Sequence, residues 1–310
     1  RGQRLVGVEQ SGDGGQVTVR GPDGDSVIRG LYLVGADGDR GVVRGLAGIT
    51  ALVSPPTVSA MMGLVRSVTP DVLPRGWHRT PGGWTVVRQV EDGAFLIRTL
   101  ETSGPAQDRE SQPDPAELEL QVCRILGTRV RFGEVPYVSR FSDFTRLADC
   151  YRRGRVLLAG DAAHLHFPIG GQGLSAGVLD ALNLGWKLAR VALGAAPAEL
   201  LDTYEAERRP AAVRLVESTR AQLGLMREGY EQRALCEQFT ALMAVPEAQA
   251  QVAARISGQD LTCPPRCGRS CRSEGVFWPD RRLVVRDEEG SQAMVTVVDL
   301  LRPGRPVLIE

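Results

Sequence analysis

Short apolar runs punctuated by glycine dominate the first half of the chain, whereas helical spacing dominates the second half. Residues 31–35 and 156–159 are short apolar runs, a pattern typical of strands buried on both faces. Three further runs within residues 4–29 are separated by polar turns, and Gly21-Pro-Asp-Gly24 has the residues that favour a tight turn. We therefore expect a small β-meander and two buried strands that lie far apart in the sequence.

The middle of the chain predicts a second sheet with one helix. Residues 84–90 and 94–100 alternate between apolar and polar positions and are joined by Glu91-Asp-Gly93, which indicates a hairpin. Asp114 followed by Pro115 is typical of a helix start, and an apolar stripe then continues to Gly127. Residues 130–144 predict a return to strand.

Helical periodicity begins near residue 174. Gly194 is a natural helix end, and residues 200–258, rich in Ala, Leu, Glu and Arg, are also expected to be mostly helical. Residues 283–285 and 295–301 suggest strands. Apolar side chains recur on one side of the first helix, which we expect to be its core-facing side: Leu174, Val178, Leu182, Trp186 and Ala189.

Composition describes an ordinary globular protein and excludes several classes. The 310 residues are 43% hydrophobic and 24% charged with a formal net charge of zero, so nucleic acid is not an expected partner. No run is long and apolar enough to span a bilayer, and no signal peptide is visible. The cysteines are scattered, and Cys263, Cys267 and Cys271 have a spacing that suits free thiols better than a zinc site. We expect a cytoplasmic protein that does not associate with membranes.

One segment carries most of the chemistry. Asp161 follows the apolar run at 156–159, at the sheet edge where α/β proteins hold ligands. Gly170, Gly171 and Gly173 allow close backbone approach to a flat ligand, and the free N–H groups of the helix that follows favour negative charge. Residues 171–176 fit GxGxxA, but the strand ended ten residues earlier, so a Rossmann fingerprint is not favoured.

Metal binding is not predicted from the same segment. His164 and His166 could lie on one side of a strand, but a zinc site needs further ligands and none is evident.

The whole segment 160–189, GDAAHLHFPIGGQGLSAGVLDALNLGWKLA, resembles the second flavin motif of class A FAD-dependent aromatic monooxygenases. The resemblance is to the para-hydroxybenzoate hydroxylase fold and its actinobacterial polyketide-hydroxylase and phenol-hydroxylase-like branch. It implies that Asp161 binds the ribityl hydroxyls of FAD and that Pro168 and the glycine loop line the isoalloxazine ring. Backbone N–H groups near Leu174 and Ser175 would face the N1/O2 edge of the flavin; Ser175 stands where the family usually has Asn.

A second motif resembles the same family. Asp37, Gly38 and Arg44 follow the apolar run at 31–35 and match the family's DG motif, whose Asp lies near both FAD and NADPH. Gly41 stands where the family usually has Ser, which weakens one polar contact and the helix cap. The complete set of cofactor-binding residues implied by the resemblance is Asp37, Gly160, Asp161, Pro168, Gly170, Gly171, Gln172, Gly173, Leu174 and Ser175.

The implied fold is of the α/β (α+β) class. It comprises part of an FAD-binding Rossmann-like domain, an inserted mixed β-sheet substrate domain and a helical C-terminal region. The expected segments are 1–50 and 151–215 for the FAD-binding domain, 51–150 for the substrate domain, 216–262 for a helical region and 263–310 for an incomplete thioredoxin-like segment.

The implied activity is NADPH-dependent hydroxylation of an aromatic substrate, of polycyclic polyketide type, by molecular oxygen through a flavin C4a-hydroperoxide. Baeyer–Villiger oxidation or antibiotic inactivation by the same fold remain alternatives, and a homodimer is possible. The sequence identifies no side chain as a general acid or base. Six residues could contact the substrate, although packing in the core is the simpler role for each: Met61, Met62, Trp77, Trp84, Phe95 and Tyr137.

The start of the chain differs from that of the resembled family. The chain begins at Arg1 and contains no βαβ unit with GxGxxG before the meander, where the family carries the FAD pyrophosphate. We therefore expect about half of an FAD site, and an inactive fragment that serves only as a binding module is a further alternative.

Overall fold

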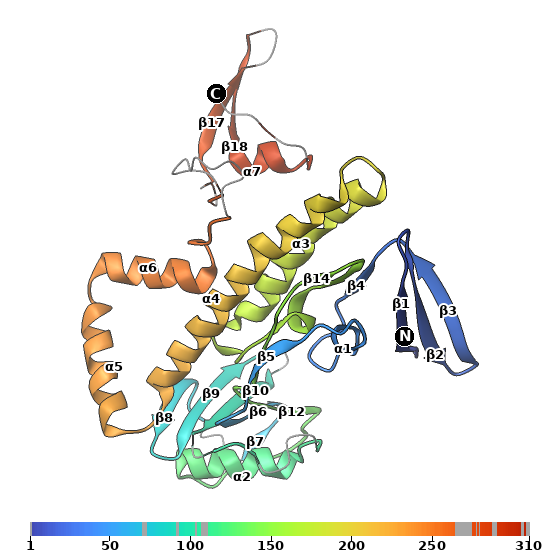
Figure 1. Ribbon diagram of the computed structural model, residues 1–310. Coiled ribbons are helices and arrows are strands. Elements are labelled where there is room, and N and C mark those ends of the chain that lie inside the picture. Colours follow the sequence, from blue (N-terminus) through green and yellow to red (C-terminus); the bar gives the residue numbers. More distant parts are fainter. Residues whose placement is uncertain are drawn as a thin grey trace. The chain divides into compact units, whose positions relative to one another are not determined.

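The computed structural model describes residues 2–69, 73–90, 93–102, 104–106, 111–263, 275–276, 278, 280–286, 290–304 and 307. It forms two compact units, Arg1–Val252 and Ala253–Glu310, which are described separately. Figure 1 labels their helices and strands.

The two buried strands predicted at 31–35 and 156–159 pair with each other. Strand β4 (Leu33–Gly35) runs parallel to β15 (Val156–Leu158), and β14 (Arg152–Arg153) lies antiparallel on the other side of β15. The predicted meander is also confirmed, as three antiparallel strands: β1 (Arg4–Gln10), β2 (Gly15–Gly21) and β3 (Gly24–Gly30). The small parallel sheet brings the two sequence motifs, at 36–44 and 160–177, to the same sheet edge.

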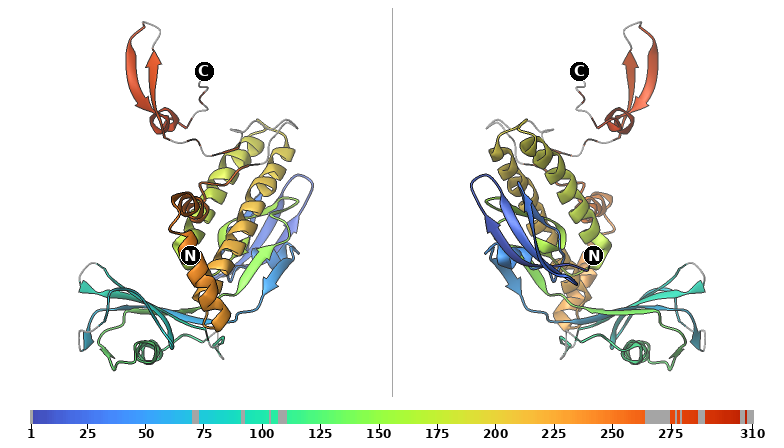
Figure 2. Two further views of the ribbon diagram at one scale, coloured as in Figure 1. Left: turned by 90° about the vertical axis from the view of Figure 1, so that its left-hand side faces the viewer. Right: turned by 90° about the vertical axis from the view of Figure 1, so that its right-hand side faces the viewer.

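Helix α3 (Gln172–Ala192) lies alongside α4 (Asp202–Met226), as Figures 1 and 2 show, and both contribute to the core around β15. The expected core-facing side of α3 is wrong. Leu174 is 81% exposed and Leu182 65%, and the other three members of the predicted stripe, Val178, Trp186 and Ala189, are exposed as well. The buried side instead carries Asp180, Leu184 and Lys187, because α4 supplies charged partners for the two polar side chains.

The middle region forms a five-stranded sheet in the order β12, β6, β10, β9, β8. The four pairings are all antiparallel, so the expectation of a mixed sheet is corrected in this respect; β8 with β9 and β9 with β10 are hairpins, which join antiparallel strands. The predicted hairpin is confirmed as β9 and β10. The bounds are β6 (Ser59–Val65), β8 (Gly76–Thr80), β9 (Gly83–Gln89), β10 (Phe95–Glu101) and β12 (Tyr137–Phe141).

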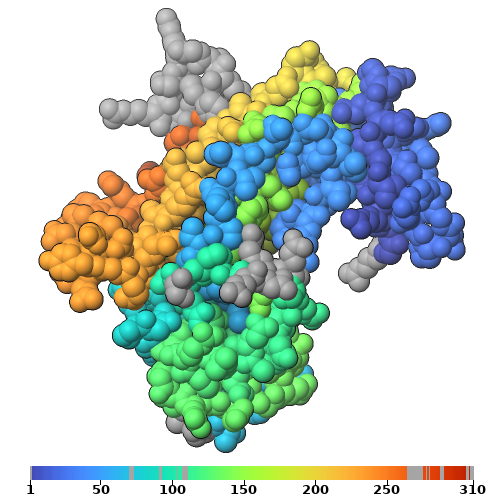
Figure 3. Space-filling model, turned by 60° about the horizontal axis from the view of Figure 1, so that its bottom comes forward, coloured from blue at the N-terminus to red at the C-terminus, as the bar shows by residue number. Residues whose placement is uncertain are grey.

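Helix α2 (Pro115–Leu126) covers one face of this sheet, and the cyan and green residues of the region lie together in Figure 3. Its predicted start and end are confirmed. Asp114 accepts a hydrogen bond from the Ala116 N–H within a capping box, and Gly127 ends the helix with a left-handed φ of 66°.

The first unit also contains shorter strands. β5 (Ala51–Ser54), β13 (Thr145–Ala148) and β16 (His164–Leu165) form one small sheet. The single strand expected over 130–144 is two strands, β11 (Arg131–Phe132) paired with β7 (Val68–Thr69) and then β12, because a Gly-Glu-Val-Pro turn at 133–136 intervenes. The short helix α1 spans Val43–Leu46.

The predicted helical tail is confirmed. It consists of α4, α5 (Tyr230–Leu242) and α6 (Pro246–Ser257). In the second unit β17 (Arg282–Arg286) pairs with β18 (Gln292–Thr296). The strand expected at 295–301 is wrong beyond Thr296, because Thr296 and Asp299 form a capping box that starts helix α7 (Val297–Leu301).

Cys263 is exposed, whereas Cys267 and Cys271 lie outside the described residues, so the expectation of free thiols stays a prediction. No helix in the described part of the chain has both the length and the apolar character needed to cross a membrane.

Candidate functional site

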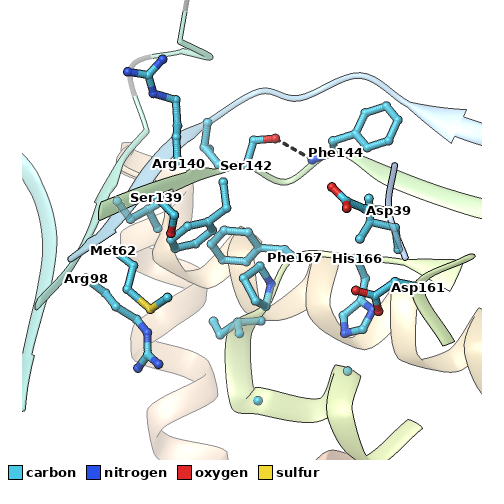
Figure 4. A pocket seen from close by; sticks show the side chains of 18 of the residues that line it. Asp39, Met62, Arg98, Ser139, Arg140, Ser142, Phe144, Asp161, His166 and Phe167 are labelled. Carbon is cyan, nitrogen blue, oxygen red and sulfur yellow. Dashed lines mark hydrogen bonds between the residues drawn. The ribbon is translucent and has the colours of Figure 1, made fainter. Parts of the chain in front are cut away.

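A cavity of about 1470 Å³ lies in the first unit, between the segment that follows β15 and the five-stranded sheet. Figure 4 shows the two walls. Asp161 and His166 belong to one wall, and Met62, Arg98 and Ser139 belong to the other.

The first wall contains five of the ten residues predicted to bind a cofactor: Asp161, Pro168, Gly171, Gly173 and Leu174 line the cavity. The other five, Asp37, Gly160, Gly170, Gln172 and Ser175, do not line it. Gly160 and Gly170 hold the backbone beside the wall, and the Gln172 amide lies within 3.4 Å of the Ile169 carbonyl oxygen. The sequence therefore located this wall.

The glycine loop adopts a backbone that other residues rarely adopt. Gly170 and Gly171 have φ values of 72° and 67°, in the left-handed region. Gly171 is the N-cap of α3, and no side chain caps this helix start. Gly171, Gly173 and Leu174 at this helix start line the cavity, where the first N–H groups of a long helix favour an electron-rich or anionic group.

A buried network fixes the turn that carries Asp161. One oxygen of Asp180 accepts hydrogen bonds from the Gly160 N–H at 3.0 Å and lies 2.8 Å from His164 Nε2. The other oxygen accepts from Arg208 Nε at 2.8 Å. Burial alone would raise the pKa of Asp180, but its hydrogen bond and charge interaction with His164, and those with Arg208, outweigh burial and lower it.

His164 thus contributes to the network that holds the Gly160–Asp161 turn. No group of three or more potential metal-binding side chains occurs among the residues that the structure describes.

His166 has a different role. It is 7% exposed and lines the cavity, and neither ring nitrogen has a hydrogen-bond partner among the described residues. Burial, together with the charge of His164, lowers the pKa of His166 to about 4, so the ring is neutral at pH 7. A neutral imidazole offers a ligand one donor and one acceptor. Sequence reasoning considered this residue only as a metal ligand and did not predict this position.

Asp37 does not line the cavity. Its carboxylate accepts hydrogen bonds from the N–H groups of Val42 at 2.6 Å and Val43 at 3.0 Å, so it caps α1. A Cβ atom on Gly41 would lie 2.2 Å from the nearest Asp37 oxygen, which explains why this chain has no side chain there. The neighbouring Asp39 and Arg40 line the cavity instead.

The second wall is the face of the five-stranded sheet that points away from α2. Among the six residues considered for substrate contact, Met62 and Trp77 line the cavity. Phe95 does not, because it packs on the opposite face against α2, and Tyr137 is 49% exposed but lies outside the lining. Trp84 also lines the wall, whereas Met61 packs with Phe95 in the core.

The tryptophans of this wall are held in place. Trp84 donates its indole N–H to the Met226 carbonyl at 2.7 Å, which ties the sheet to the end of α4. Trp77 meets Trp84 edge-on, with ring centroids 6.2 Å apart, and the Arg79 guanidinium lies 5.3 Å from the Trp84 ring centroid. The wall thus presents rigid aromatic surface to the cavity.

Comparison with known proteins finds one matching family and several similar proteins. A family described as FAD binding domain matches residues 1–219. The 12-dehydrotetracycline 5-monooxygenase/anhydrotetracycline 6-monooxygenase of Streptomyces rimosus is 36% identical over 303 residues, which cover 93% of this chain and 58% of that protein. The dialkyldecalin synthase of Streptomyces rugosporus is 37% identical over 314 residues, covering 100% of this chain and 62% of the relative.

Among solved structures, CabE, an aromatic hydroxylase from angucycline biosynthesis, superposes with a TM-score of 0.88 at 35% identity. The match covers 98% of this chain and 61% of CabE. The chain therefore spans about six-tenths of the length of the proteins that it matches.

The first wall fits a flat, electron-rich group such as a flavin ring. An added Cβ on Gly171 would meet no atom within 4 Å, so the loop leaves open space in front of its backbone. Gly173 lies against His166, where a Cβ would approach ring atom Cε1 to 3.2 Å. The uncapped start of α3 and the carboxylate of Asp161 supply donors and an acceptor around this space.

Proposed function

The chain belongs to the FAD binding domain family, and from that premise we propose that it is part of a flavin-dependent monooxygenase acting on an aromatic substrate. The observation that supports this most is the two-walled cavity. One wall has a glycine loop, a carboxylate and a helix N-terminus, and the other is an apolar sheet face with two tryptophans. FAD is the cofactor of the family, and the dimensions leave room beside a flavin ring for a multi-ring substrate, since typical ligand pockets measure about 300–1,000 Å³.

The proposed cofactor contacts follow the first wall. Asp161 would accept hydrogen bonds from the ribityl hydroxyls, and the loop from Pro168 to Gly173 would lie against the ring. Bound flavin supplies electron transfer and oxygen activation, with NADPH as the proposed reductant. The N-terminal N–H groups of the helix that begins at Gln172 would favour negative charge on a ring held against the loop.

The chain's own residues orient the substrate and exclude water from it. The tryptophan wall offers flat apolar surface for an aromatic ring system, and His166 offers a neutral donor and acceptor near Asp161 (Figure 4). A polycyclic substrate is proposed because the names of the relatives refer to anhydrotetracycline, a dialkyldecalin and angucycline biosynthesis. We also propose the segment boundaries given from the sequence, with residues 51–150 as the substrate-binding part.

Oxygen incorporation tests this function directly. Purified chain supplied with FAD, NADPH and ¹⁸O₂ is incubated with a hydroxyanthraquinone, and the product is analysed by mass spectrometry. A product that carries one ¹⁸O atom is expected. NADPH consumption that yields hydrogen peroxide but no oxygenated product, with several aromatic probes, would contradict the proposal.

A non-oxidative reaction in the same cavity is a second candidate, because one relative that the whole chain matches is named a synthase. Substrate conversion in the absence of NADPH and oxygen would favour this candidate over the monooxygenase.

A further inference from the structure

A row of side chains crosses the cavity wall of the five-stranded sheet from edge to edge. The strand registers pair the members one after another: Ser139 with Met62, Met62 with Arg98, Arg98 with Val86 and Val86 with Trp77. All five line the cavity. Four interstrand spacings of about 4.8 Å make the row about 19 Å long, so it is a continuous platform for a multi-ring ligand.

Arg98 is the middle member of this row and its only charged residue. The alternation of β10 fixes its direction: Ile97 is fully buried in the core against α2, and Thr99 donates a hydrogen bond to Gln121 of α2 at 2.6 Å. Arg98 lies between them and faces the opposite side, toward the cavity, as Figure 4 shows. Its lateral neighbours, Met62 and Val86, are apolar.

Two other arginines of this sheet are already paired, whereas Arg98 has no ion-pair partner in the described part of the chain. Arg140 forms an ion pair with Glu117, and Arg79 forms one with Glu228 at 3.1 Å. An apolar ligand lying on the row would remove water from the Arg98 guanidinium and leave it without an acceptor, which is unfavourable. The wall therefore discriminates against ligands that bring no acceptor for this cation.

On the basis of the proposed function, we infer that Arg98 determines substrate specificity by binding an anionic oxygen, a carboxylate or phenolate, on the aromatic substrate. The planar guanidinium donates two parallel hydrogen bonds to a carboxylate, which a lysine ammonium does not reproduce.

The charges of the cavity also set the orientation of such a substrate. Asp161 lies at the other end of the cavity from Arg98 in Figure 4, and Asp39 is on the same side as Asp161. Arg40, the neighbour of Asp39, also lines the cavity and offsets its charge, so an anionic group is attracted by Arg98 and repelled mainly by Asp161. The substrate therefore binds with its acidic end toward Met62 and Arg98 and presents the rest of its ring system to the wall of the glycine loop.

Equilibrium binding of a matched pair of probes tests this inference without any turnover. Anthraquinone-2-carboxylate and anthraquinone-2-carboxamide have the same ring system and differ in charge. Their affinities for the purified chain are measured by isothermal titration calorimetry at neutral pH and low salt. The wild-type chain should bind the carboxylate about tenfold or more tightly than the amide, the range expected for a hydrogen-bonded charge pair.

Substitutions then assign the preference to one residue. Arg98→Met should weaken the binding of the carboxylate probe alone, so that the two probes bind with similar affinity. Arg98→Lys should keep part of the preference for the carboxylate probe. Arg88→Met is the matched control, because Arg88 is an exposed arginine on neighbouring β9 that does not line the cavity; it should leave the preference unchanged. Arg98→Gln serves if the Met variant does not fold.

The possible results separate this inference from the proposed function. If both probes bind the wild-type chain with equal affinity, or if Arg98→Met weakens both equally, the role of Arg98 is refuted while an aromatic-binding cavity stands. If neither probe binds the folded wild-type chain, the aromatic-binding cavity is refuted and the role of Arg98 with it.

Discussion

Replacing Asp180 tests whether the buried network beneath the cavity holds the Gly160–Asp161 turn in place. Asp180 is 0% exposed and joins three partners from different parts of the chain: Gly160, His164 and Arg208. Asp180→Ala would leave the Arg208 guanidinium, whose side chain is 10% exposed, without a counter-charge. Removing one partner of a buried ion pair costs about 3–5 kcal/mol, a large part of the roughly 5–15 kcal/mol that stabilises a typical domain.

The assay is urea-induced unfolding followed by circular dichroism, together with FAD affinity measured by flavin fluorescence. Asp180→Ala should lower the free energy of unfolding by about 3–5 kcal/mol and weaken FAD binding, because the Asp161 turn loses its anchor. Asp202→Ala is the control. Asp202 forms an ion pair with Arg152 at 2.8 Å but is 67% exposed, so its loss should cost about 1 kcal/mol or less. Equal effects of the two substitutions would refute the reasoning.

Three further outcomes are expected. The pKa of His166 is lowered from 6.5 to about 4, so between these two pH values the unfolded chain binds a proton at this residue and the folded chain does not. The free energy of unfolding therefore falls by up to about 1.4 kcal/mol for each pH unit as the pH drops from 6.5 to 4. His166→Asn should flatten the pH dependence of the urea midpoint. Gly41→Ala should displace the Asp37 carboxylate that caps α1 and destabilise the protein by about 1 kcal/mol. Gly45→Ala, within α1 and with open space around it, should be neutral or stabilising in the same unfolding assay. Leu182→Lys on the exposed apolar side of α3 should reduce self-association, including any homodimer, in size-exclusion chromatography. If the wild-type chain elutes as an oligomer and the variant elutes at the same volume, this expectation is contradicted.

Elements set by local signals were predictable from the sequence. The cap formed by Asp114 and the left-handed Gly127 define α2 within a dozen residues, and the parallel pair β4 and β15 follows from two unbroken apolar runs. The wall formed by Asp161 and the glycine loop was located for the same reason, since its residues are contiguous.

Features that depend on distant partners were not predictable. The orientation of α3 follows from Asp180 and Lys187, whose charged partners Arg208 and Glu207 lie 28 and 20 residues away. The spacing of apolar residues carries no information about such pairs, so the exposed side of α3 was predicted to be the buried one.

The second wall shows a related limit. Alternation along β10 separates Phe95 from Arg98, but the sequence does not say which face is covered by α2 and which faces the cavity. An aromatic residue was therefore preferred over the arginine that lines the cavity. The signal that could have identified Arg98 was its position as a charged residue in the middle of the largely apolar strand β10.

FAD binding by the chain tests the central claim most directly. Purified chain is titrated into FAD, and quenching of flavin fluorescence gives the dissociation constant for the wild type and for Asp161→Ala. The cavity wall described here predicts saturable binding that Asp161→Ala weakens by about tenfold or more, the loss expected when a charged acceptor of hydrogen bonds is removed. Equal affinity of the two proteins, or no binding by either folded chain, would contradict the assignment of this wall to the flavin.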